Sequence, residues 1–156
     1  MIYKPLATFL VTTLVSVLLQ PAYASDGIVK HIPMQQKESQ TYYVSAFVKG
    51  VGELDLLVDT GSGYMTINEF MLKTLEADEQ VTFQKYIQGN LADGSMVEVP
   101  VYRLKKINIG GDCIIYDIDV AVFPGETPCI LGLSALRKMT PFVFSTHPPT
   151  LQLSNC

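Results

Sequence analysis

Histidine and cysteine are scarce in this chain, and their positions exclude the common metal and nucleophile sites. The two histidines, His31 and His147, lie far apart, and none of the three cysteines forms a Cys-x-x-Cys pair. Structural zinc sites gather four such ligands at short spacings, so we expect no metal and no cofactor. The stretch Gly61-Ser62-Gly63 lacks the Gly-x-Ser-x-Gly pattern of a serine hydrolase elbow. These absences argue against a zinc site and against a serine nucleophile.

Positive charge is also in short supply. The chain has 11 Lys and Arg against 15 Asp and Glu, which gives a formal net charge of −4. Its densest basic cluster, Arg103 with Lys105 and Lys106, is typical of a solvated strand edge. Nucleic-acid-binding proteins concentrate basic residues on one face. We therefore expect no nucleic-acid partner.

A long apolar run occurs only near the N-terminus. Leu6–Leu19 is apolar apart from a few hydroxyl residues, Lys4 precedes it, and Ala22-Tyr23-Ala24 follows it. These are the three regions of a secretory signal peptide, here residues 1–24. The run is short for a membrane span, which needs ~20 residues, and an uncleaved anchor is the alternative. We expect an exported protein, periplasmic or secreted, attached to the inner membrane only if this segment stays uncleaved.

The cysteines bear on the same compartment, because exported proteins can form disulfides. Cys113, Cys129 and Cys156 are an odd number. One intramolecular pair leaves one free thiol, and Cys156 could instead pair between chains. All three intramolecular pairings remain open at this stage.

The remainder of the chain predicts a small β protein. Residues 25–40 are polar and are expected to form a flexible arm before a domain at 41–156. Alternating apolar segments separated by Gly, Pro and Asp-Gly turns are typical of antiparallel strands. Such segments occupy 41–49, 53–59, 64–67, 81–87, 96–109, 113–123, 129–132, 140–144 and 150–153, with short helices expected at 68–75 and 134–139. This pattern predicts an all-β fold, a mostly antiparallel closed barrel with one or two short helices.

One Asp-Thr-Gly, Asp59–Gly61, follows the apolar run Leu56–Val58. The run predicts a buried strand, and the Thr-Gly predicts a tight turn at its end. Taken alone, an Asp in this position is more often a structural turn residue. A carboxylate at the edge of a core is nevertheless suited to acid–base chemistry. Because the motif occurs once, a reaction that needs two carboxylates requires a second copy of the chain.

Three motifs in order resemble the retropepsin-like aspartic proteases, the single-domain relatives of retroviral protease. Leu56–Ser62 is similar to the apolar-Asp-Thr-Gly-Ser signature, and Leu91–Ser95 falls where the family has its flap hairpin. Ile130–Gly132, before a short helix, is similar to the second signature. The resemblance covers roughly residues 41–153 and implies an acid-protease-like barrel.

The resemblance also implies a homodimer with a two-fold axis between two Asp59 side chains. Two carboxylates about 3 Å apart share one proton. The ionised partner would activate a water molecule that attacks a peptide carbonyl, and the protonated partner would supply a proton, without metal or covalent intermediate. In this scheme Asp59, Thr60 and Gly61 form the catalytic turn, and Thr60 hydrogen-bonds across the axis.

The implied substrate is a polypeptide that lies as an added strand beneath the flap. The resemblance places these residues around it: Ala92, Asp93, Gly94, Ser95, Ile130, Leu131 and Gly132. Side-chain pockets are expected to be lined partly by Leu56, Ile87 and Leu131. Gly132 would let its strand pass under the Asp59 loop without a clash.

Two departures support an alternative hypothesis, a catalytically silent module that holds extended peptides in the same cleft. Gly63 stands where relatives often have a polar residue, and the last predicted strand, 150–153, is a short contribution to a dimer interface. A strict monomer could not assemble the pair of carboxylates, so the oligomeric state discriminates between the two hypotheses.

Overall fold

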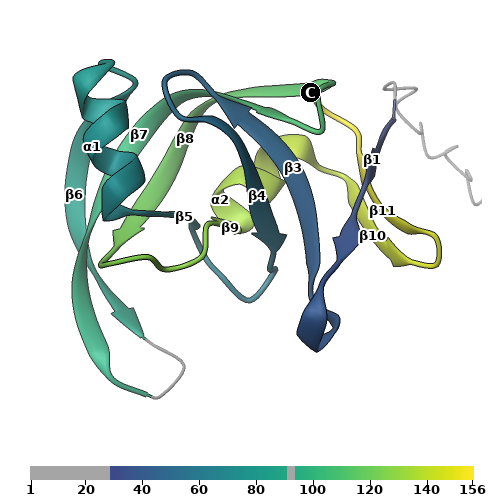
Figure 1. The fold of residues 1–156 in the computed structure, drawn as a ribbon, viewed down its shortest axis with the longest axis horizontal. Coiled ribbons are helices and arrows are strands. Elements are labelled where there is room, and N and C mark those ends of the chain that lie inside the picture. Colours follow the sequence, from purple (N-terminus) through teal and green to yellow (C-terminus); the bar gives the residue numbers. More distant parts are fainter. Residues whose placement is uncertain (1–28, 91–93) are drawn as a thin grey trace, which may run out of the picture.

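A computed structural model of the chain describes residues 29–90 and 94–156 (Figure 1). The predicted signal peptide lies outside the described residues. Among those residues, no helix has the length and hydrophobicity needed to cross a bilayer.

Six strands close into a barrel, as the sequence predicts. In spatial order they are β3 (Tyr42–Val48), β4 (Gly52–Val58), β9 (Ile130–Leu131), β5 (Met65–Asn68), β8 (Cys113–Phe123) and β7 (Met96–Ile109). The barrel closes because β3 also pairs with β7, through Ala46 and Phe47. Two further strands, β2 (Gln35–Gln36) and β6 (Val81–Asn90), extend the sheet beyond β3 and β7. Most pairs are antiparallel, but β4–β9 and β5–β8 are parallel.

Short helices occur at the two places where the sequence predicts them. Helix α1 (Glu69–Ala77) begins at Asn68, whose side-chain oxygen accepts a hydrogen bond from the Met71 N–H at 2.9 Å. That contact satisfies one of the free N–H groups of the first turn. Helix α2 (Leu133–Leu136) continues into a 3₁₀ turn, η2 (Arg137–Met139), and a further 3₁₀ turn, η1 (Glu38–Gln40), precedes β3.

A separate three-stranded sheet, at the right of Figure 1, joins the two ends of the domain. Its order is β1 (Lys30–Pro33), β11 (Pro149–Leu153) and β10 (Phe142–Thr146), all antiparallel. The flexible arm expected over residues 25–40 is therefore wrong for Lys30–Pro33 and Gln35–Gln36, which form β1 and β2. Ile32 is buried against Gly110, where an added Cβ would come within 2.4 Å of the Ile32 side chain.

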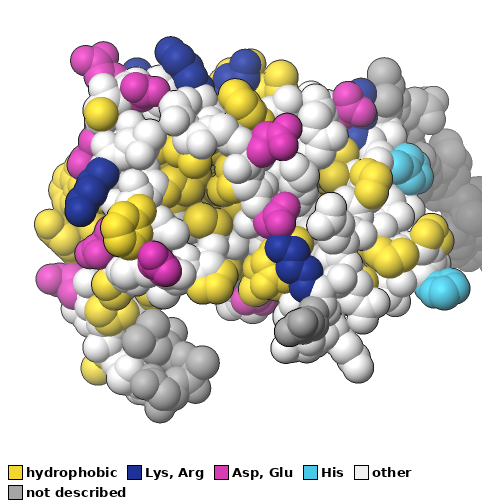
Figure 2. Space-filling view, viewed as in Figure 1, with side chains coloured by type: hydrophobic (Ala, Val, Ile, Leu, Met, Phe, Trp, Pro, Cys, Tyr) yellow, Lys and Arg dark blue, Asp and Glu magenta, His cyan; other side chains and the backbone are white. Residues whose placement is uncertain are grey.

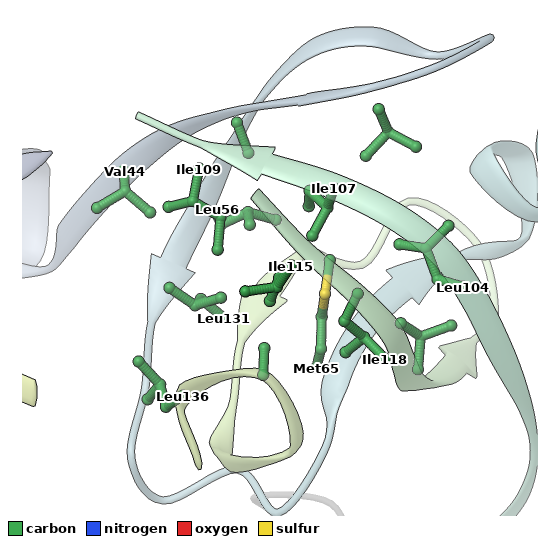
Figure 3. Close-up of a cluster of buried hydrophobic side chains, with 14 of the residues drawn as sticks. Val44, Leu56, Met65, Leu104, Ile107, Ile109, Ile115, Ile118, Leu131 and Leu136 are labelled. Atoms are coloured by element: carbon green, nitrogen blue, oxygen red, sulfur yellow. The ribbon is translucent and has the colours of Figure 1, made fainter. Parts of the chain in front are cut away.

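The barrel interior is filled by aliphatic side chains from alternate strand positions (Figure 3). Val44 and Leu56 meet Ile107, Ile109 and Leu131 there, all essentially inaccessible to solvent. Burying each such side chain contributes about 1.5–3 kcal/mol relative to leaving it exposed. This packed core fixes the positions of β4 and β9, the two strands that carry the predicted motifs.

One disulfide links Cys113, at the start of β8, to Cys156. Cys129 is the free cysteine and is partly buried. Of the pairings that the sequence leaves open, the structure has the one that anchors the C-terminal hairpin to the barrel.

Candidate active site

Strand β4 places Asp59 at the start of the loop that leads into β5. The Asp59 N–H donates to the Leu131 carbonyl at 3.3 Å, which continues the β4–β9 pairing into the loop. The loop then folds back, because the Gly61 N–H donates to Oδ1 of Asp59 at 2.8 Å and the Ser62 N–H donates to the Asp59 carbonyl at 3.4 Å. The carboxylate is thus oriented by its own turn and remains partly exposed to solvent.

Gly132 lies directly under this loop, as predicted. A Cβ added to it would stand 2.0 Å from the Tyr64 carbonyl oxygen and 2.9 Å from that of Ser62. The close approach allows the Leu133 N–H to donate to the Ser62 carbonyl at 2.8 Å. Any side chain at position 132 would push the loop away from β9, so only glycine fits this site.

Ser134 in α2 fixes the far end of the loop, and sequence reasoning missed it. Its Oγ accepts from the Met65 N–H at 2.8 Å and donates to the Asp119 carbonyl at 2.6 Å. The hydroxyl therefore ties α2, β5 and β8 together. Its partners are distant in the sequence, and the only local signal is a serine at the start of a short helix.

Thr60 and Gly61, at the tip of the turn, are both exposed. Within residues 29–90 and 94–156, no hydrogen bond is made by the Thr60 side chain. Its predicted partner belongs to a second copy of the chain, so the cross-axis contact stays a prediction.

The predicted flap corresponds to the hairpin of β6 and β7. The two strands pair from Val81↔Leu104 to Asn90↔Met96, and Gly94 takes a φ of +83°, which suits glycine. Gly94 and Ser95 are exposed. Ala92 and Asp93 lie outside the described residues, and their predicted contact with substrate stays a prediction.

The comparison with known proteins follows this geometry. The family model described as "gag-polyprotein putative aspartyl protease" matches residues 44–138, a span that holds the Asp59 turn, the β6–β7 hairpin and Gly132. The chain belongs to this family of retropepsin-like aspartyl proteases.

A solved structure shows the same fold. The crystal structure of a retropepsin-like aspartic protease from Rickettsia conorii is similar with a TM-score of 0.60 and 20% sequence identity. The likeness covers 81% of this chain and 92% of that one. No curated protein matches the chain.

The cleft residues of this retropepsin-like chain differ in part from the prediction. Leu56 and Leu131 have no exposed surface and belong to the core, so the expectation that they line a substrate pocket is wrong. Ile130 is partly exposed and pairs with Leu57. Leu57 shares the face of β4 that carries Asp59, because alternate strand residues point the same way. Sequence reasoning missed Leu57, although counting back two positions from Asp59 would have found it.

Ile87, the other predicted pocket residue, is partly buried at the base of the flap hairpin. It packs with Tyr64 against a small separate cluster formed by Val99, Val101 and Ala121. Lys85 extends over the Tyr64 ring, 6.0 Å from its centroid. The base of the flap hairpin is therefore apolar, and it includes Tyr64, which follows Asp59 by five residues.

A pocket of about 540 Å³ borders the site loop without including Asp59. Gly63 and Tyr64 form one side of it, and an ion pair between Arg103 and Asp119 forms another. The hydrogen bond that Arg103 Nε donates to the Asp119 carboxylate raises the pKa of Arg103. In the same described residues, no group of three or more His, Cys, Asp or Glu could hold a metal ion.

Proposed function

We propose that this chain is an aspartic endopeptidase whose active site forms between two copies, each contributing Asp59. One observation carries the proposal: a partly exposed Asp59, oriented by the Gly61 N–H, stands on an Asp-Thr-Gly turn packed against Gly132. That arrangement occurs in a chain of the aspartyl protease family. The pocket next to this loop is lined by Gly63 and Tyr64 and not by Asp59, as expected for a site that a second subunit completes.

The chemistry follows from bringing the two carboxylates together. At about 3 Å they cannot both ionise easily, so the pair holds one proton. The ionised carboxylate removes a proton from a water molecule, which attacks the carbonyl carbon of the scissile peptide bond. The protonated carboxylate hydrogen-bonds the carbonyl oxygen and then passes its proton toward the leaving nitrogen.

The surrounding residues support that reaction in the proposed dimer. Thr60, exposed and adjacent to Asp59, hydrogen-bonds across the two-fold axis and holds the two turns together. The flap tip at residues 92–95 closes over an extended polypeptide. Leu57 and Ile130 flank the carboxylates and favour apolar side chains next to the cleaved bond. Residues 1–24 direct the protein out of the cytoplasm. Its substrates are therefore exported or envelope polypeptides.

The test is cleavage of an unstructured protein, casein, by the purified protein at pH 4 to 7. Wild type should cut it, and Asp59→Asn should not, while circular dichroism shows the same fold for both. Asp112→Asn is the matched control, because Asp112 is exposed in the turn between β7 and β8. Cleavage retained by Asp59→Asn would remove Asp59 from the mechanism.

The pH profile is a second test, since the dyad must hold one proton to work. Activity should therefore be highest at acidic to mildly acidic pH and should fall on the alkaline side. A rate that rises steadily up to pH 9 would contradict the shared-proton mechanism.

The silent peptide-binding module remains the second candidate, favoured by the open space at Gly63. An added Cβ there meets no atom within 4 Å, so the residue leaves room beside the loop without contributing a polar group. This alternative predicts that wild type and Asp59→Asn bind an extended peptide equally and cleave nothing.

A further inference from the structure

The pocket of about 540 Å³ beside the site loop has the size of a small-ligand site, since such sites span about 300–1,000 Å³. Four parts of the chain line it: the loop after β4, strand β7, strand β8 and the α2–η2 segment. Hydrogen bonds join these walls, because the Ser134 Oγ donates to the Asp119 carbonyl at 2.6 Å and Arg103 Nε donates to the Asp119 carboxylate. The pocket is therefore built from the barrel and its helix and does not depend on the flap tip.

Positive charge predominates among the side chains of this pocket. Three basic residues and two acidic ones line it: Arg103, Arg137, Lys138, Asp117 and Asp119. Both acids interact with Arg103, Asp119 through the hydrogen bond and Asp117 by electrostatic attraction. Arg137 and Lys138 are exposed, and no ion pair within residues 29–90 and 94–156 includes them. The pocket thus has two positive charges that its own acids do not compensate.

This gathering of positive charge differs from the surface that Figure 2 shows. On that face, Lys and Arg side chains are dispersed, and Asp and Glu side chains are scattered among them. One more cation lies close to the pocket, because Lys85 extends over the ring of the lining residue Tyr64, 6.0 Å from its centroid. Concentrated positive charge raises the local concentration of anions. A negatively charged group is therefore the ligand that this pocket favours.

Gly63 leaves the pocket open toward the proposed cleft. It follows Asp59 by four residues, it is exposed, and an added Cβ would meet no atom within 4 Å. Tyr64, the next lining residue, packs like Ile87 against the small apolar cluster at the base of the flap hairpin. The pocket therefore adjoins both the Asp59 loop and the flap base. No side chain at position 63 blocks a substrate side chain that enters from the loop.

We infer that this pocket selects substrates with an aspartate or glutamate a few residues from the cleaved bond, and that Arg137 and Lys138 bind its carboxylate. In the proposed function, Leu57 and Ile130 contact the residues next to that bond, so the pocket at Gly63 receives a more distant side chain. The carboxylate accepts charge-assisted hydrogen bonds from the guanidinium and ammonium groups. The inference rests on the proposed endopeptidase and adds the chemical class of its substrates.

The test compares two peptides that differ in one side chain. Wild type cleaves a synthetic peptide library at pH 6, where glutamate is ionised, and mass spectrometry identifies the residues around each cleaved bond. One cleaved sequence is then made with Glu and with Gln at the acidic position. The ratio of kcat/KM for the two peptides is measured for wild type, for the double variant Arg137→Gln/Lys138→Gln and for Lys73→Gln. Lys73 is the matched control because it is an exposed lysine on α1, outside this pocket.

Wild type and Lys73→Gln should cleave the Glu peptide about three- to tenfold better than the Gln peptide, as expected for partly exposed ion pairs. The difference should lie in KM, because a contact away from the reacting atoms binds the ground state and the transition state alike. The double variant should bring the ratio close to one. A library profile without acidic enrichment, a profile that favours Lys or Arg, or an unchanged ratio in the double variant would overturn the inference.

A binding measurement separates this inference from the proposed function if wild type cleaves nothing, and replaces the double variant if that protein fails to fold. Amide NMR spectra of wild type are recorded with the blocked peptide acetyl-Ala-Glu-Ala-amide and with its Gln counterpart. Only the Glu peptide should shift the amide signals of Gly63, Ser134 and Lys138. Such shifts in a protein that cuts no peptide keep the carboxylate pocket and remove the protease. Asp59-dependent cleavage without acidic preference does the reverse, and equal shifts with both peptides, or none, would overturn the pocket.

Discussion

The substitution Gly132→Ala probes the packing that holds the Asp59 turn. The added methyl carbon would stand 2.0 Å from the Tyr64 carbonyl oxygen, 2.5 Å from the Tyr64 carbonyl carbon and 2.9 Å from the Ser62 carbonyl oxygen. All three atoms are backbone, so no side-chain rotation can relieve the clash. The loop must move by more than about 1 Å before these contacts become ordinary.

The expected loss of stability has two parts. Overpacking a rigid site costs about 1–3 kcal/mol. Moving the loop also breaks the hydrogen bond from the Leu133 N–H to the Ser62 carbonyl, now 2.8 Å, at about 1 kcal/mol. We therefore expect Gly132→Ala to lower the free energy of unfolding by about 2–4 kcal/mol. Any cleavage activity should fall as well, because the displaced loop begins at Asp59.

Urea unfolding followed by circular dichroism measures this effect. Gly63→Ala is the matched control in the same loop, because an added Cβ there meets nothing within 4 Å. Its free energy of unfolding should stay within about 0.5 kcal/mol of wild type. Equal stability of the two alanine variants would refute the argument that β9 needs glycine beneath the loop.

Three other predictions concern stability and titration. Cys156→Ser should lower the free energy of unfolding by about 4 kcal/mol, because the disulfide closes a loop of 43 residues; unchanged stability in urea would mean that the bond does not form in solution. Burial raises the pKa of Cys129, so its thiol should be alkylated more slowly at pH 8 in the folded protein than in urea, and equal rates would contradict this. Burial, then the hydrogen bond to Glu76, raises the pKa of Tyr102 above its ordinary 10.0. Its contribution to stability is therefore complete below about pH 10 and is lost as pH rises through the folded pKa, a dependence that Tyr102→Phe should reduce.

The strands that the sequence predicts best are those with strong local signals. The structure has β7 and β8 at the predicted bounds, because both alternate clearly and are separated by a Gly-Gly turn. By contrast, β1 is four residues long and acquires its conformation from β11, far along the chain. Ile32 is the only buried residue of β1. A single buried apolar residue does not produce the alternating pattern from which a strand is predicted.

The candidate site likewise contains residues that local motifs predict and residues that no local motif predicts. The Asp59 turn and Gly132 were recognisable because their motifs are contiguous in sequence. Leu56 and Leu131 were misassigned because nearness to a motif does not say which face of a strand a side chain occupies. Ser134 joins Met65, 69 residues away, and no local pattern encodes that contact.

A mixing experiment tests most directly whether two Asp59 side chains share one active site. Folded but inactive Asp59→Asn protein is added in equal amount to wild type, and casein cleavage is measured after subunits have exchanged. If each active site needs Asp59 from both copies, mixed dimers are inactive, and activity per wild-type chain should fall to about half. Activity that is unchanged by the added variant would contradict the shared dyad.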